Sequence, residues 1–140
     1  MGQHEICSAW RNKLLRLICT RGDSFHTDPV LLTMLIDQLY ACFQQESSPP
    51  LTAYPAAYRQ LVRKQTTLGW RQLFNGRWST EWARLHNRYL KRHFNPIPDQ
   101  LIGSKWMAHH IDLMWTQMRK LWDLRNGKVH GVDTSTHMEA

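Results

Sequence analysis

The sequence predicts an all-α protein: a single compact bundle of five to six helices with a proline-rich hinge after the second helix. Apolar residues recur at helical spacing through most of the 140 residues, and no stretch alternates apolar and polar residues as a half-buried strand does. Prolines and glycines gather in short breaks between the helical stretches. A chain of this length buries about two-thirds of its unfolded surface, which is enough for one domain over residues 1–140.

Residues 1–46 are expected to form an N-terminal helical hairpin. Its first helix is predicted over Ile6–Thr20, where apolar side chains recur three and four residues apart. The sequence "RGDS" follows, and because Gly-Asp is common in turns, a turn is expected at residues 21–24. An adhesive role for this Arg-Gly-Asp triplet is set aside, because nothing in the sequence suggests secretion.

The second helix has a clear start signal. Thr27 or Asp28 can cap it, and Pro29 suits the first helical position. Its wide apolar stripe is expected to end by Glu46. The sequence "SSPP" follows at residues 47–50, and its two prolines stop a helix and stiffen a linker.

Residues 51–130 are expected to form a basic, tryptophan-rich helical core, with a loose tail at residues 131–140. Two Asn-Gly pairs and the segment "NPIPD" divide this core. Ser79 is a candidate N-cap, and Glu81 suits the positive end of the helix that follows it. The predicted helices cover residues 54–66, 67–74, 79–94 and 103–125.

Composition narrows the classes of partner and compartment. The net charge of +7 favours nucleic acid, an anionic membrane surface or an acidic protein as partner. The three cysteines lack metal-ligand spacing, the apolar run of a signal peptide is missing, and the longest apolar run is too short to cross a bilayer. The sequence therefore predicts a soluble intracellular protein, nuclear or cytoplasmic, with no metal site and no membrane partner.

Positive charge is concentrated in residues 47–98. This segment contains one acid, Glu81, and carries a net charge of +8, so the two ends of the chain together are slightly acidic. Such segregation indicates a binding surface more strongly than an even distribution of charge does. The basic residues are Arg59, Arg63, Lys64, Arg71, Arg77, Arg84, Arg88, Lys91 and Arg92.

Four of these cations recur at steps of three and four, so they line one face of the predicted helix over residues 79–94. They are Arg84, Arg88, Lys91 and Arg92. A helix with a basic outer face can lie against a phosphate backbone. A solvated face without any partner explains the same charges equally well.

Four aromatic rings step by four residues through the stretch "LGWRQLFNGRWSTEW". An aromatic stripe at helical spacing is usually core, so Trp70, Phe74 and Trp82 are predicted to be buried. Trp78 falls in a predicted turn. We expect it to be exposed beside Arg77, at the edge of a nucleic-acid-binding surface.

The last predicted helix is apolar over more than half of its circumference. Such a helix is either central to a bundle or docks on a partner, and methionines suit an adaptable interface. A central position is expected, with a protein partner on the Trp106–Trp122 helix as the alternative. The apolar residues are Trp106, Met107, Ile111, Met114, Trp115, Met118, Leu121 and Trp122.

Motifs for catalysis are missing from the sequence. It contains no nucleotide-binding loop, nucleophile elbow, metalloprotease motif or paired carboxylates. His86 and His93 can share a helix face but lack a third metal ligand, and His109 and His110 point to different faces. Surface positions are expected for these histidines. The sequence therefore predicts no enzymatic activity, no catalytic residue and no cofactor.

Two stretches carry a family resemblance. "LGWRQLFNGRWSTEW" fits the pattern LGW-x-QL-x-x-GR-x-S-x-x-W, and "LWDLRNGKVHG" fits LW-x-x-RN-x-x-x-HG. In this order the pair resembles the C-terminal accessory region of proteins related to non-LTR retrotransposon polyproteins, which carry a reverse transcriptase. The resemblance covers about Leu68–Asp133. It implies a retroelement-derived context and a nucleic-acid partner, and it assigns no biochemical role to any residue.

The function that these observations predict is a non-enzymatic accessory domain that binds nucleic acid, DNA or RNA, without sequence preference. One alternative is a protein-interaction module that docks on a missing polymerase domain, with the basic residues only solubilising it. A relic without retained function is another. The predicted phosphate contacts are Arg59, Arg63, Lys64, Arg84, Arg88, Lys91 and Arg92, with Arg77 and Trp78 at the edge.

Overall fold

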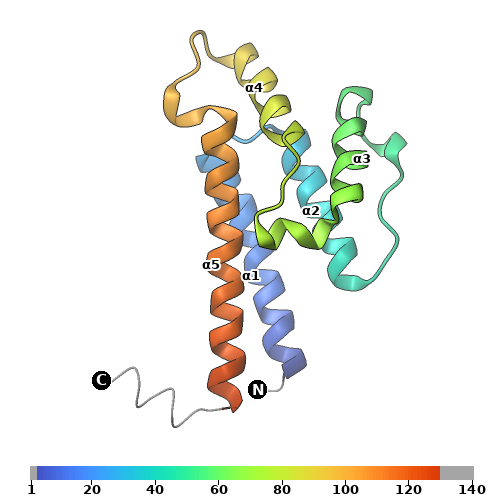
Figure 1. The fold of residues 1–140 in the computed structure, drawn as a ribbon, viewed down its shortest axis with the longest axis vertical. Helices are drawn as coiled ribbons and strands as arrows, with labels where there is room; N and C mark the ends of the chain where they lie inside the picture. The colour runs from blue at the N-terminus through green and yellow to red at the C-terminus, as the bar shows by residue number, and fades with distance from the viewer. Residues whose placement is uncertain (1–2, 130–140) are drawn as a thin grey trace.

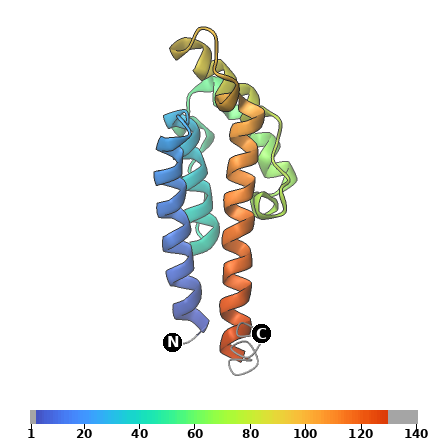
Figure 2. The same cartoon turned by 90° about the vertical axis from the view of Figure 1, so that its left-hand side faces the viewer.

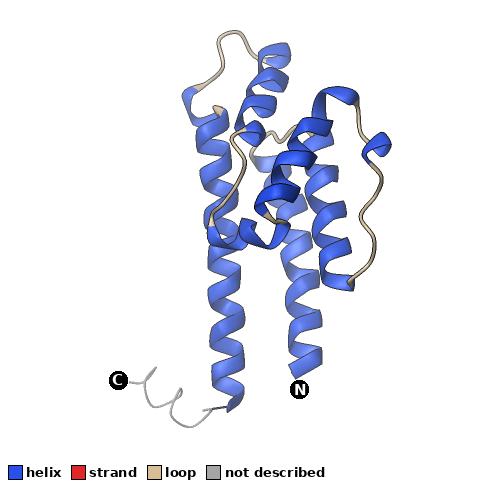
Figure 3. Ribbon diagram, turned by 45° about the vertical axis from the view of Figure 1, so that its right-hand side comes forward, coloured by secondary structure: helices blue, strands red, loops and turns tan. Residues whose placement is uncertain are grey.

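The computed structural model describes residues 3–129, and every regular element within that range is a helix (Figures 1 and 3). The prediction of an all-α fold is therefore confirmed. The α-helices are α1 (Gln3–Ser24), α2 (Pro29–Gln44), α3 (Arg59–Leu68), α4 (Glu81–His93) and α5 (Gly103–Val129). Short 3₁₀ segments lie between them: η1 (Leu51–Ala53), η2 (Ala56–Tyr58), η3 (Trp70–Asn75) and η4 (Asp99–Leu101).

The two longest helices, α1 and α5, set the shape of the molecule. They lie side by side and run in opposite directions (Figures 1 and 2). α2 packs against α1, and α4 packs against α5. Gly103 permits this second contact, because a Cβ atom there would lie 2.3 Å from the carbonyl oxygen of Ala83. The N–H of Gly103 also donates to Oδ1 of Asn87 over 2.6 Å.

The first helix is longer than the sequence predicts. α1 continues through the "RGDS" stretch to Ser24, so the prediction of a turn at residues 21–24 is wrong. Packing explains the difference, because Gly22 is buried and a Cβ atom on it would lie 3.0 Å from Cδ1 of Leu32. The bare glycine lets α2 come close, and this tertiary contact outweighs the local turn preference.

The second helix begins where the start signal indicates. Oδ1 of Asp28 accepts a hydrogen bond from the N–H of Val30 over 2.9 Å, and Pro29 takes the first helical position. The helix ends at Gln44, and residues 46–50, which include the predicted hinge, are irregular.

The third helix begins later than predicted. Tyr54, the first residue of the predicted helix, is extended with φ −114° and ψ 152°. Pro55 accounts for this, because proline disfavours the helical conformation in the residue before it. The short separate helix predicted over residues 67–74 is present as η3, but it is a 3₁₀ helix and begins three residues later. α3 runs on to Leu68, and Gly69, whose φ of +105° favours glycine, separates the two.

The last two helices agree with the sequence at their starts. Oγ of Ser79 accepts a hydrogen bond from the N–H of Glu81 over 3.2 Å, and α4 ends one residue before Phe94. α5 continues to Val129, so the predicted stop at Asn126 and Gly127 is wrong. The predicted tail at residues 131–140 lies outside the described residues.

The core is richest in aromatic rings where α4 and α5 meet. Trp82 and Trp106 are fully buried, and their ring centroids lie 6.4 Å apart. The predicted burial of Trp82 and Phe74 is confirmed. Trp70 is only half-buried, and its ring packs edge-on against Trp82 at 6.0 Å.

Candidate nucleic-acid interface

The basic face of α4 is exposed. Its four cations, predicted to share one side of the helix, all lie on the solvent side, while Trp82, Leu85 and Leu90 of the same helix are buried. Arg88, Lys91 and Arg92 have no carboxylate partner among the described residues. Their charges are therefore available to an anion.

Arg84 differs from these three because it is paired. Its Nη2 lies 2.6 Å from Oε2 of Glu81, and its Nε lies 3.0 Å from the same oxygen. Lys64 of α3 reaches Oε1 of the same carboxylate over 3.5 Å. The bonds from Arg84 lower the pKa of the Glu81 carboxyl despite its burial. The single acid of the basic segment thus partly neutralises two of the predicted phosphate contacts.

Asp28 and Tyr58 adjoin the α4 cations. The Tyr58 hydroxyl donates to Oδ2 of Asp28, which joins η2 to the start of α2. Burial and this bond to a carboxylate raise the pKa of Tyr58 to about 12, while the charges of Arg88 and Arg92 oppose the rise. The charges of these two guanidinium groups are thus felt at the Tyr58 hydroxyl.

The two arginines of α3 differ in their exposure and bonding. Arg59 is half-buried, and its Nε donates to the carbonyl oxygens of Leu51 and Tyr54 over 3.2 and 3.1 Å. It therefore holds η1 against α3. Arg63 is exposed and has no bonded carboxylate in the described part of the chain.

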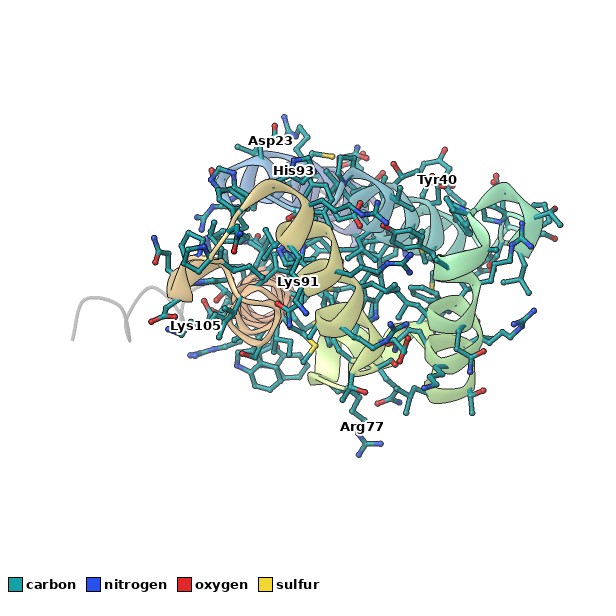
Figure 4. The ribbon with its side chains drawn as sticks, turned by 90° about the horizontal axis from the view of Figure 1, so that it is seen from above. Asp23, Tyr40, Arg77, Lys91, His93 and Lys105 are labelled. Carbon is teal, nitrogen blue, oxygen red and sulfur yellow. The ribbon has the colours of Figure 1, made fainter. Side chains whose placement is uncertain are left out.

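Arg77 and Trp78 do not extend the α4 face. Arg77 projects outward at the lower edge of the view in Figure 4, whereas Lys91 lies near the centre of that view and His93 toward its opposite side. The prediction that Trp78 is exposed is wrong, since only 7% of it is accessible. Its Nε1 donates to the carbonyl oxygen of Leu73 over 3.0 Å, and its ring lies 5.3 Å from that of Trp82. The turn folds this ring inward, so it offers no stacking surface.

Gln65 organises the tryptophan-rich stretch, although no sequence pattern pointed to it. This fully buried amide donates to the carbonyl oxygens of Gly69 and Arg77 over 3.2 and 3.1 Å. Its Oε1 accepts from the N–H of Ser79 over 2.9 Å and from Nε1 of Trp82 over 3.0 Å. One side chain therefore fixes the corner that orients α4 against α3.

Two histidines are buried, so the prediction of surface positions for them is wrong. His86 and His110 are fully inaccessible, and neither ring nitrogen of either has a hydrogen-bond partner among the described residues. Both rings pack on Trp106, at centroid distances of 4.5 and 4.8 Å. Burial lowers the pKa of His86 to about 4 and that of His110 to about 3.

α5 has an apolar face in the core and a second one in solvent. Trp106, Met114 and Leu121 are buried, as expected for a central helix. Trp115 and Trp122 are 51% and 63% exposed, and their spacing of seven residues places them on one side of the helix. The predicted partner helix Trp106–Trp122 thus offers only its later part to a partner.

Comparison with known proteins identifies no relative of this chain. No protein-family model, curated protein or solved structure matches the chain. Within residues 3–129, no helix has both the length and the apolar character that crossing a membrane requires. No three His, Cys, Asp or Glu side chains in that range gather as a set of metal ligands.

Proposed function

We propose that this chain is a non-enzymatic domain that binds nucleic acid without sequence preference through the basic face of α4. One observation carries the proposal: Arg88, Lys91 and Arg92 share one exposed helix face and have no carboxylate partner in the described range. Lysine and arginine side chains placed this way contact phosphates and release counterions. Arg63 is the fourth free cation that we include, on the neighbouring α3.

The retroelement context of the two sequence motifs is part of this proposal. The resemblance implies a nucleic-acid partner, and a phosphate-binding surface suits that context. Contacts to phosphate carry no sequence information, and this agrees with a basic face whose aromatic neighbours are buried.

A salt titration tests the proposal. Fluorescence anisotropy with labelled duplex DNA, single-stranded DNA and RNA should show affinity that falls linearly with the logarithm of salt concentration. Reversing the three α4 charges (Arg88→Glu, Lys91→Glu and Arg92→Glu) should weaken binding. On duplex DNA the slope should fall by about 0.9 for each phosphate that the variant no longer neutralises.

A matched control changes the net charge equally elsewhere. Lys13→Glu, Arg16→Glu and Lys120→Glu reverse three exposed cations on α1 and α5. This variant should keep most of the salt slope. Equal losses of affinity in both triple variants, or no binding of the unmodified protein at low salt, would refute the proposal.

Protein interaction through α5 is the second candidate function. The exposure of Trp115 and Trp122 supports it, because large aromatic side chains on one exposed face are typical of interfaces. Self-association of the isolated chain tests this function. Charged residues flank the two rings, so variants that reverse those charges make the test specific.

A further inference from the structure

A cavity of about 400 Å³ lies where α1, the end of α2, η3 and α5 meet. It is separate from the α4 face, since no residue of α4 lines it. Its apolar floor consists of the buried Trp10, Phe74 and Leu121 and the half-buried Phe43, and exposed polar residues surround it. The exposed rim consists of Gln45, Arg71, Asn75 and Arg125.

The floor of the cavity is aromatic. The Trp10 ring lies 5.9 Å from that of Phe74 and 6.1 Å from that of Phe43, measured between centroids. Phe43 and Phe74 are 6.2 Å apart. Three rings from three different elements thus face one space, and such a floor favours a flat apolar body over a bare ion.

Three guanidinium groups border the same space. Arg11 is held in place, because its Nη1 donates to the carbonyl oxygen of Phe43 over 3.2 Å and its charge lies 5.4 Å from that ring. Arg71 and Arg125 have no bonded carboxylate within the described range, and no acid lines the cavity. Guanidinium groups in this number select carboxylate or phosphate.

Both sequence motifs contribute residues to this cavity. "LGWRQLFNGRWSTEW" contributes Arg71, Phe74 and Asn75, and "LWDLRNGKVHG" contributes Leu121 and Arg125. Two distant stretches therefore bring unpaired cations and apolar side chains to one place.

We propose that the cavity binds a small aromatic anion, a flat ring system that carries a carboxylate or a phosphate monoester. The ring would lie on the floor formed by Trp10, Phe43 and Phe74. The anionic group would bind the guanidinium groups of Arg71 and Arg125, and the side-chain amides of the rim would contact polar ring edges. The volume is within the usual range for small-molecule sites.

Cysteine protection gives a site-specific test. Cys7 and Cys42 line the cavity and are half-buried, whereas Cys19 is exposed outside it. Adenosine 5′-monophosphate and 2-naphthoate are the probes, with adenosine and 2-naphthylmethanol as neutral counterparts. At least one anion should slow alkylation of Cys7 and Cys42 by iodoacetamide, read by mass spectrometry, and leave Cys19 unchanged. Which anion protects better distinguishes phosphate from carboxylate as the natural group.

Charge-neutral variants test the arginines. Arg71→Gln and Arg125→Gln should each weaken binding about tenfold or more, since each removes a charge-assisted hydrogen bond. Arg77→Gln and Lys120→Gln remove exposed cations that lie near Arg71 and Arg125 in the sequence but do not line the cavity, and these variants should bind normally. The triple α4 variant should also bind normally, which separates this site from the nucleic-acid proposal.

Two outcomes would overturn the proposal. One is the absence of protection by either anion at millimolar concentration. The other is unchanged affinity in both Arg71→Gln and Arg125→Gln. Circular dichroism of each variant shows whether its helices are intact, and because both side chains are exposed, intact folding is expected.

Discussion

Gln65 shows how one buried amide can determine local architecture. It satisfies two carbonyl oxygens and two N–H groups at the bends on either side of η3. The carbonyl oxygen of Gly69 also accepts from the N–H of Gln72 over 3.1 Å, whereas Gln65 is the partner shown for the Arg77 carbonyl oxygen and the Ser79 N–H in the described structure. An unpaired buried polar group is costly. The tryptophan-rich stretch therefore depends on a residue that lies upstream of it.

Gln65→Leu is expected to destabilise the protein strongly. It removes the partner of the buried Ser79 N–H and of the buried Trp82 Nε1, and the Arg77 carbonyl oxygen also loses its bond, so the free energy of unfolding should fall by about 3 kcal/mol or more. Urea unfolding measures the change. Gln60→Leu, an exposed glutamine on the same helix, is the control and should shift stability by about 0.5 kcal/mol at most. Similar losses of stability in both variants would show that the hydrogen bonds of Gln65 contribute little.

At the scale of the element, α5 combines a core face and a solvent face. The solvent face carries Trp115 and Trp122, with Asp112 and Arg119 exposed along one flank. Asp112 and Arg119 are seven residues apart, as the two rings are. In an antiparallel pair of helices related by a two-fold axis, each flank meets the same flank of the other copy. Asp112 of each copy would then face Arg119 of the other, so a second copy of the chain suits this face.

Self-association through α5 should therefore depend on both rings and charges. Trp115→Ser with Trp122→Ser should give a monomer in sedimentation velocity, whereas Leu124→Ser, an exposed apolar residue on another side of α5, should not. Asp112→Arg should weaken the dimer, and adding Arg119→Asp should restore it. A chain that is monomeric up to high micromolar concentration would contradict this mode of pairing.

At the scale of the whole molecule, the two buried histidines make the fold sensitive to acid. His86 and His110 pack around Trp106, at the junction of α4 and α5, and no group within residues 3–129 forms a hydrogen bond that would stabilise a charged ring. Their folded pKa values, about 4 and about 3, lie below the ordinary value of about 6.5. Below pH 6.5 the unfolded chain therefore takes up protons that the folded chain excludes, and stability falls as pH falls.

We expect the free energy of unfolding to drop by about 2 kcal/mol for each of these histidines between pH 7 and pH 5. His86→Phe and His110→Phe keep an aromatic ring against Trp106 and should flatten this dependence. His93→Gln, at an exposed position on α4, should leave it unchanged. Urea unfolding at both pH values is the measurement, and equal stability of the unmodified protein at pH 7 and pH 5 would refute the expectation.

The sequence by itself determined the helical class, the concentration of positive charge and several helix ends. Asp28 with Pro29 starts α2, Ser79 precedes α4, and Gly76, with φ +79°, ends η3 as its Asn-Gly pair indicated. These features depend on interactions within a few residues, which local sequence encodes directly. The shared face of the α4 cations also follows from helical spacing alone.

Only the tertiary structure decided which side chains are buried and which charges are paired. Trp78 is buried because α5 packs over it, and His110 because its face of α5 lies against Trp78 and Phe25. α1 continues through Gly22 because α2 covers it. Glu81 pairs with Lys64 as well as Arg84 because α3 and α4 lie together. The cavity bordered by Arg71 and Arg125 exists for the same reason. Burial and pairing depend on contacts between residues far apart in the chain, and helical periodicity carries no information about those contacts.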